Sequence, residues 1–108
     1  MYPLTRLRRT RMHKWSRNVV KENVISSSDL ILPIFIKEGK KKEEEISSMP
    51  DVYKYSIDNL EKIVTQAIKN KIPAIALFPE IENDKKDEIG SEALNENNLV
   101  CKAVREIK

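Results

Sequence analysis

Two short apolar runs limit the folds that this chain can adopt. The first covers residues 30–36 (LILPIFI) and the second covers residues 75–78 (IALF). Apolar runs without polar alternation are typical of strands that are covered on both faces. Between them, residues 57–68 carry apolar side chains at helical spacing. Two such strands joined by a helical crossover predict a right-handed β–α–β unit with parallel strands, so the expected fold class is α/β.

Polar residues predict where these elements end. Ser56 can cap the central helix, which is expected to end near Asn70. A further amphipathic helix should begin near Asn97 or Asn98 and continue to Lys108, where the sequence stops. A β–α–β–α unit of this kind leaves an open sheet edge and bare helix faces. The pattern therefore indicates the beginning of a larger sheet.

Three other features concern the strands and the segments between them. Residues 37–45 (KEGKKKEEE) carry clustered like charges, so a solvated loop without an active site is expected there. Residues 80–96 are likewise expected to form a polar loop. Pro33 cannot donate a hydrogen bond to a neighbouring strand, so either its nitrogen faces an unpaired edge or the strand is locally irregular.

The N-terminal region differs in charge from the rest of the chain. Five of the six arginines fall within the first 17 residues, and residues 1–22 carry seven basic groups and one acid, a net charge of +6. Residues 23–108 carry 13 basic and 16 acidic groups, a net charge of −3. Arginine forms planar two-point pairs with carboxylates and phosphates. Residues 1–28 are therefore interpreted as a basic arm that docks on a partner.

The arm also has an apolar side, which limits the kind of partner. On a helical wheel, Met12, Trp15, Val19 and Val20 share one side, opposite the basic residues. A short amphipathic helix needs a surface to lie on, and another subunit, a membrane or a nucleic acid would each provide one. A transit peptide is a fourth interpretation. Because Trp15 lies away from the arginines, a protein partner is favoured. The expected contact residues are Arg8, Arg9, Arg11, Met12 and Trp15.

Composition excludes several other classes of protein. No apolar run reaches the roughly 20 residues that cross a bilayer, and no apolar segment follows the basic N-terminus as in a secretory signal. A soluble, cytoplasmic protein is therefore expected. Cys101 is the only cysteine and His13 the only histidine. A single cysteine excludes an intramolecular disulfide. Cys101 and His13 together cannot supply the three ligands of a metal site.

Several short motifs, taken in their order along the chain, resemble one enzyme family. They are Leu7-Arg8-Arg9, residues 29–35 (DLILPIF), Ser48-Met49-Pro50, Ile72-Pro73-Ala74, residues 76–79 (ALFP), Lys86-Asp87, Gly90-Ser91-Glu92-Ala93, Leu99-Val100 and Ala103-Val104-Arg105. This succession resembles the start of δ-aminolevulinic acid dehydratase, also called porphobilinogen synthase. The resemblance covers essentially the whole chain.

The resemblance implies a (β/α)₈ TIM barrel, which typically needs about 250 residues. Residues 29–108 would then be its first two strand–helix units, truncated, and residues 1–28 an oligomerisation arm that embraces a neighbouring subunit of a homo-oligomer. The family is a lyase of haem and porphyrin biosynthesis that condenses two δ-aminolevulinate molecules into porphobilinogen. It uses Schiff-base lysines and either zinc or magnesium. Both the lysines and the zinc segment belong to later parts of the family's chain.

No catalytic residue and no metal ligand is therefore expected in this chain, which alone should be inactive and bind neither substrate nor metal. Phe78, at the end of the second strand, matches a wall residue near the family's substrate, although a plain core aromatic is the alternative. Asp51, Lys71 and Asn98 stand where the family commonly has glycine, and Lys71 would be strained if it ends the first helix with a positive φ. The alternative function is a small, basic-armed module that binds nucleic acid.

Overall fold

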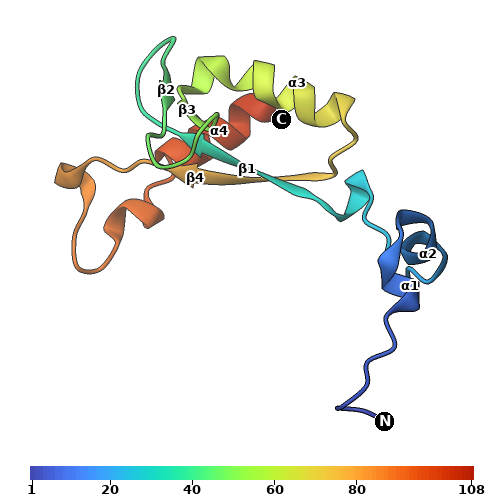
Figure 1. Cartoon of the computed structure of the whole chain (residues 1–108). Helices are drawn as coiled ribbons and strands as arrows, with labels where there is room; N and C mark the ends of the chain where they lie inside the picture. The colour runs from blue at the N-terminus through green and yellow to red at the C-terminus, as the bar shows by residue number, and fades with distance from the viewer.

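A four-stranded sheet forms the centre of the body, and the arm extends away from it (Figure 1). The computed structural model describes residues 1–108. Its strands are β1 (Ile31–Ile36), β2 (Glu43–Glu45), β3 (Tyr53–Tyr55) and β4 (Ala74–Pro79), in the order β2-β3-β1-β4. β1 and β4 are parallel, with Ile31 opposite Ala74 and Ile36 opposite Pro79. This confirms the predicted α/β class and the parallel pair of apolar strands.

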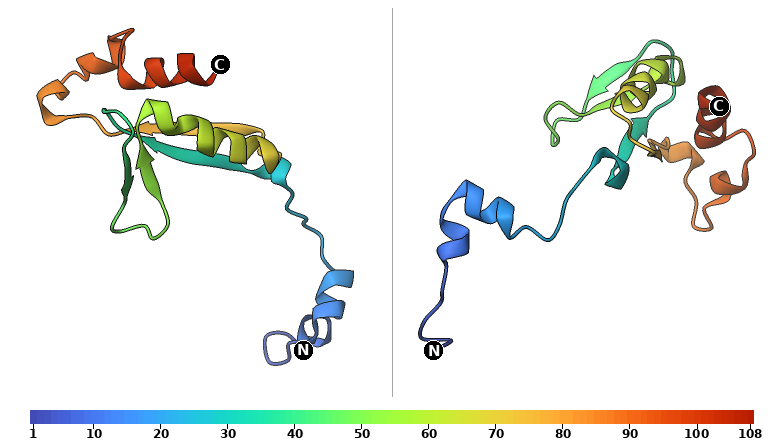
Figure 2. Two further views of the ribbon diagram at one scale, coloured as in Figure 1. Left: turned by 90° about the horizontal axis from the view of Figure 1, so that it is seen from above. Right: turned by 90° about the vertical axis from the view of Figure 1, so that its right-hand side faces the viewer.

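Two helices supply the hydrophobic core on one face of this sheet (Figure 2). The crossover from β1 to β4 contains α3 (Leu60–Lys69), and α4 (Leu99–Ile107) follows β4. Both helices turn most of their apolar side chains toward the sheet, as the helical spacing predicted, whereas Ile68 and Val104 stay exposed. The fully buried cluster is small and consists of Ile34, Ile36, Leu60, Leu99 and Ala103. Because side chains alternate along a strand, Ile34 and Ile36 of β1 belong to this cluster, and Ile75 and Leu77 of β4 pack against it half-buried.

The opposite face of β1 and β4 is apolar but uncovered. Its side chains are those of Ile31, Pro33, Phe35, Ala74, Ala76 and Phe78, which pair in register across the two strands. Phe78 is 50% exposed, and its ring centroid lies 5.6 Å from that of Phe35. The sequence predicted strands covered on both faces, whereas this chain itself covers only one.

Two arrangements were expected for Pro33, an unpaired edge beside its nitrogen or a locally irregular strand, and the structure agrees with the first. The N–H of Lys37 donates to the carbonyl of Tyr55 in β3 over 2.9 Å. Main-chain groups alternate in direction along a strand, so those of Phe35 and Pro33 also point toward the β3 side of β1. The pairing of β1 with β3 is confined to Phe35 and Ile36. Pro33 therefore directs its nitrogen to an unpaired edge beyond the end of β3, where no donor is needed.

A β-hairpin occupies part of the segment that was expected to be a solvated loop, so that expectation is wrong for Glu43–Glu45. β2 pairs antiparallel with β3, and β3 continues the sheet beside β1. The like charges do not repel the strand from the sheet because lysines compensate them. Glu43, for example, lies 3.6 Å from the ammonium of Lys62.

Four alternating charges connect all four strands, and we call them the charge ring. Lys37 follows β1, Glu44 lies on β2, Lys54 lies on β3 and Glu80 follows β4. Lys54 is 2.8 Å from Glu80 and 4.0 Å from Glu44, while Lys37 contacts Glu44 and lies 3.6 Å from Glu80. The lysine side chains are only 17% and 24% exposed. The ring therefore holds the hairpin against the carboxyl ends of β1 and β4.

The helix ends differ in how well the sequence predicted them. Asn98 caps α4, because its side-chain oxygen accepts the N–H of Cys101 over 2.8 Å. Ser56 precedes a 3₁₀ turn, Ile57–Asn59, that leads into α3, but its side chain makes no capping hydrogen bond. Its buried hydroxyl instead accepts the N–H of Lys42 over 2.9 Å, which fixes the preceding loop. The expected capping role of Ser56 is therefore wrong.

α3 ends in a Schellman motif whose left-handed residue is Lys71, with φ 56°. The N–H of Ile72 donates to the carbonyl of Ala67, and the N–H of Lys71 donates to that of Ile68. Glycine usually occupies this position, so the conditional expectation of strain at Lys71 is confirmed. Asp51 also has a positive φ, whereas Asn98 does not, since its φ is −64°.

The arm forms two very short helices instead of one amphipathic helix. They are α1 (Arg9–Met12) and α2 (Lys14–Val19), separated by His13 in an extended conformation. The loop that follows carries the chain away to a 3₁₀ turn, Ser27–Asp29, before β1 (Figure 2). No helix in the structure combines the length and the apolar character needed to cross a membrane.

Replacing Lys71 by glycine is expected to stabilise the fold. A left-handed L-residue costs about 1–2 kcal/mol, and the added freedom of glycine in the unfolded chain offsets about 0.4–1 kcal/mol of that gain. Thermal unfolding of Lys71→Gly should therefore show a melting temperature a few degrees higher. The matched control, Lys71→Ala, removes the same charge but keeps the strained Cβ, so it should leave the melting temperature almost unchanged. Equal effects of the two changes would show that strain is not the cause.

The charge ring should stabilise the protein in a pH-dependent way. The hydrogen bond from Lys37 lowers the pKa of Glu44, and that from Lys54 lowers the pKa of Glu80, in both cases below the ordinary 4.5. A carboxylate with a lowered folded pKa contributes stability above its unfolded pKa and loses it as the pH falls through the folded value. The doubly substituted variant Glu44→Gln with Glu80→Gln should thus melt below the native chain at pH 7. That gap should close below pH 4.5, and a constant gap would contradict the prediction.

Candidate functional site

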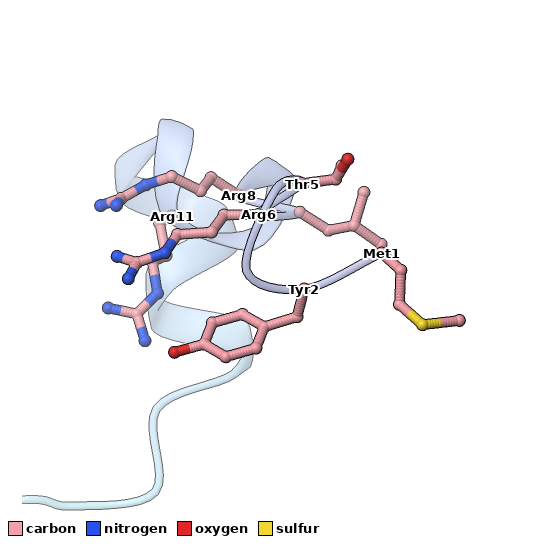
Figure 3. Close-up of a pocket in the computed structure, with 7 residues that line it drawn as sticks. Met1, Tyr2, Thr5, Arg6, Arg8 and Arg11 are labelled. Carbon is pink, nitrogen blue, oxygen red and sulfur yellow. The ribbon is translucent and has the colours of Figure 1, made fainter.

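The tip of the arm gathers three guanidinium groups on one side. Figure 3 shows the side chains of Arg6, Arg8 and Arg11 extending in the same direction, beside the ring of Tyr2. The Cζ atom of Arg6 lies 5.7 Å from the centroid of that ring, a cation–π contact. The hollow between them is lined by Met1, Tyr2, Thr5, Arg6, Leu7, Arg8 and Arg11. We call the surface formed by Tyr2, Arg6, Arg8 and Arg11 the arginine face.

No carboxylate of the chain pairs with this arginine face. All six ion pairs in the structure use lysine as the cation. Within the arm, Arg17 donates to the carbonyl of Arg11 over 3.1 Å, which is a main-chain contact and neutralises nothing. The arm therefore presents a concentrated positive charge with donors in the fork geometry that suits carboxylate or phosphate.

A second arm surface is apolar. Trp15 is 69% exposed, and Met12, Val19 and Val20 are exposed beside it. They line a shallow pocket with Arg9 and His13, and the imidazole of His13 stacks parallel to the indole at 6.4 Å. The five predicted contact residues are thus all exposed but divide between two surfaces. Arg8 and Arg11 lie on the arginine face, while Arg9, Met12 and Trp15 lie on the apolar one.

The carboxyl edge of the sheet is the second place where polar chemistry gathers. The charge ring lies there, and Phe78 is two residues before its member Glu80. Beyond it, Lys85 pairs with Glu38 over 3.4 Å, which raises the pKa of Lys85, and the hydrogen bond to Glu44 raises the pKa of Lys37. Both amines are therefore held in the protonated form.

Sequence reasoning missed the charge ring. Its members lie far apart in the chain, and no local pattern separates Lys37 or Lys54 from the other lysines. The only available signal was the sequence position of the two residues: Lys37 directly follows the first apolar run, and Glu80 follows the second after Pro79. Residues at the carboxyl ends of parallel strands meet at one edge of the sheet, so these two could have been paired.

The residues named as poor metal ligands lie in separate parts of the structure. His13 is in the arm and the free thiol of Cys101 is in α4. The structure holds no group of three His, Cys, Asp or Glu side chains that could bind a metal ion. The absence of a metal ligand from this chain stays a prediction.

Comparison with known proteins identifies the family. The family model described as delta-aminolevulinic acid dehydratase matches residues 4–108. The enzyme of that name from Bradyrhizobium diazoefficiens is 50% identical over 103 residues, which cover 95% of this chain and 29% of the relative. That from Methanothermus sociabilis is 40% identical over 107 residues, covering 99% and 33%. This chain thus spans about a third of the length of these curated relatives.

A solved structure agrees with the sequence match. The crystal structure of delta-aminolevulinic acid dehydratase (porphobilinogen synthase) from Toxoplasma gondii, in complex with the reaction product porphobilinogen, superposes with a TM-score of 0.81. The two sequences are 32% identical, and the match covers 96% of this chain and 29% of that one. The resemblance seen in the sequence motifs is confirmed, and the chain belongs to the delta-aminolevulinic acid dehydratase family.

Proposed function

We propose that this chain is the N-terminal segment of a porphobilinogen synthase, the lyase that condenses two δ-aminolevulinate molecules into porphobilinogen in haem biosynthesis. The uncovered apolar face of β1 and β4 is the observation that carries this proposal. In a (β/α)₈ barrel the helices cover the outer face of the strands and the inner face is filled by side chains. The side chains on the uncovered face, from Ile31 in β1 to Phe78 in β4, are apolar, as the interior of such a barrel requires.

The segment has two parts with different roles in this proposal. Residues 29–108 form the first two strand–helix units and initiate the barrel. A third parallel strand would pair with the open edge of β4. Residues 1–28 form an arm that holds a neighbouring subunit of a homo-oligomer. The support for this division is that α1 and α2 expose Met12, Trp15 and Val19, so their apolar side chains lack cover within the chain.

The lysines at the carboxyl edge of the sheet are unsuited to Schiff-base chemistry, which needs an unprotonated amine. A lysine becomes such a nucleophile when desolvation or a nearby cation lowers its pKa. Lys37 and Lys85 have raised pKa values instead, because their partners are carboxylates. Lys54 lies between the carboxylates of Glu44 and Glu80. These observations support the proposal that the catalytic amines of the intact enzyme belong to residues outside this segment, so that the segment alone would be inactive.

The zinc or magnesium of the intact enzyme is also assigned outside this segment. His13 and Cys101 do not approach each other or any carboxylate cluster, so the residues present do not fit a metal site. No step of the reaction is assigned to a metal held here. The alternative of a nucleic-acid-binding module rests on the charge of the arm alone and gains no support from the matched family.

A hybrid enzyme tests the proposed role. Residues 1–108 would replace the matching segment of the Bradyrhizobium diazoefficiens enzyme, to which they are 50% identical. The hybrid is expected to convert δ-aminolevulinate to porphobilinogen, while the 108-residue chain alone should give none above background. The intact relative is the positive control. Product formation by the isolated chain, or a folded hybrid without activity, would contradict the proposal.

The same hybrid tests whether Phe78 lies near the substrate. Its exposure beside Phe35, near the carboxyl end of β4, supports a position close to the mouth of the proposed barrel. Phe78→Ala should raise KM for δ-aminolevulinate by roughly tenfold, the size of effect expected for lost apolar contact with substrate. Ile68→Ala, on the exposed side of α3, is the control and should leave KM unchanged. A lowered melting temperature with an unchanged KM would make Phe78 a core residue only.

A further inference from the structure

The arginine face lacks any counter-charge that its own chain could supply. Residues 1–21 contain no acid, and no arginine of the arm lies in an ion pair. The same part of the arm exposes the apolar side chains of Leu4 and Leu7 almost completely. A partner that fits this surface must therefore combine negative charge with some apolar area.

One segment of the chain has that combination, and we call it the acidic loop. Residues 80–96 contain seven acids and two lysines, a net charge of −5. Glu82, Asp84 and Glu88 are exposed and take part in no ion pair. Ile89 and Leu94 are exposed among them. The loop thus offers these three carboxylates, a further exposed one at Glu96, and two apolar side chains.

The other acidic stretch is a weaker partner because its charges are already used. Glu43 and Glu44 of β2 pair with Lys62 and Lys37. The third glutamate of this strand, Glu45, accepts the N–H of Asp51 over 3.4 Å. Breaking such pairs to bind an arginine would cost what the new contact gains. The acidic loop requires no such exchange at Glu82, Asp84 or Glu88.

The acidic loop and the arginine face lie at opposite ends of the molecule, as Figures 1 and 2 both show. The molecule is 63 Å long, so one copy does not bring the two surfaces together. We propose that the arginine face binds the acidic loop of a second copy of this chain, with Arg6, Arg8 and Arg11 facing Glu82, Asp84 and Glu88. The proposal rests on the proposed role of the arm in subunit assembly and names the surface on which it docks.

Two copies related by a twofold axis would make this contact twice, since each would offer both surfaces. Opposite charges on the two surfaces also speed the encounter and make the association sensitive to salt. Of the two lysines in the loop, Lys85 pairs with Glu38 and Lys86 donates to the side-chain oxygen of Asn83, so neither forms an ion pair with Glu82, Asp84 or Glu88.

Charge reversal in the full chain tests the pairing, with self-association measured by analytical ultracentrifugation at low salt. The arm variant is Arg6→Glu, Arg8→Glu and Arg11→Glu, and the loop variant is Glu82→Lys, Asp84→Lys and Glu88→Lys. Each alone should weaken self-association at least about tenfold. Mixing the two should restore association, because each arm then meets a loop of opposite charge. Raising the salt should weaken the native and the mixed pairs together.

A matched control separates this contact from attraction between net charges. The control variant Lys40→Glu, Lys69→Glu and Lys102→Glu changes the net charge by the same amount as the arm variant, at exposed sites outside both surfaces. It should self-associate like the native chain and should not rescue the loop variant. Rescue by the control, or native association of the loop variant, would overturn the proposed pairing.

The outcomes also distinguish this proposal from the assembly role on which it rests. If the arm variant weakens association but the loop variant does not, the arm assembles subunits through a different surface and only the pairing is overturned. If a chain without residues 1–21 associates as tightly as the native chain, or the native chain stays monomeric, the assembly role itself fails. If the arm variant loses affinity for single-stranded RNA but self-associates like the native chain, the arginines bind nucleic acid instead of a second copy.

Discussion

The parallel pairing of β1 with β4, with helices on only one of its faces, is the constraint on which the rest of the structure depends. Alternation along the strands divides their side chains into two sets. Ile34 and Ile36 are buried against Leu60 and Leu99, whereas Phe35 and Phe78 point to the uncovered face. A core of five fully buried residues leaves much apolar surface in water. The same geometry that builds the fold therefore produces the surface that the proposed barrel would fill.

The two kinds of cation have separate tasks in this chain. Lysines compensate the glutamates of the body, and through the charge ring they hold a hairpin that apolar burial alone would not retain. Arginines are concentrated in the arm, where nothing within the chain pairs with them. Arginine is less strongly hydrated than lysine and loses less freedom per hydrogen bond formed, so it suits contacts between molecules. This separation is why the net charge of +3 describes neither surface.

The sequence predicted those elements whose formation depends on local apolar pattern. β1, β4, α3 and α4 follow from uninterrupted or helically spaced apolar residues, and α4 begins where the sequence expected it, near Asn97 or Asn98. The hairpin was missed because each of its strands has three residues and its stability comes from partners distant in the chain, such as Lys54 and Glu80. The break at His13 was missed for a similar reason, since its N–H and carbonyl both contact the side chain of Ser16, a detail that periodicity does not encode.

The uncovered sheet face and the arm expose different kinds of surface and therefore require different partners. The sheet face is apolar and ends in an open strand edge, so only further strands could satisfy both its side chains and its main-chain groups. The arm has its helical hydrogen bonds but exposes charge and small apolar patches, which a folded surface can match without adding a strand. In the proposed enzyme, closing the barrel is a step within one chain and independent of concentration, whereas docking of the arm is bimolecular and weakened by salt. The acidic loop lies between β4 and α4, and this segment already holds both elements, because β4 pairs with β1 and α4 buries Leu99 and Ala103 in the core. Docking of the arm on this loop therefore does not have to wait for the rest of the barrel to close.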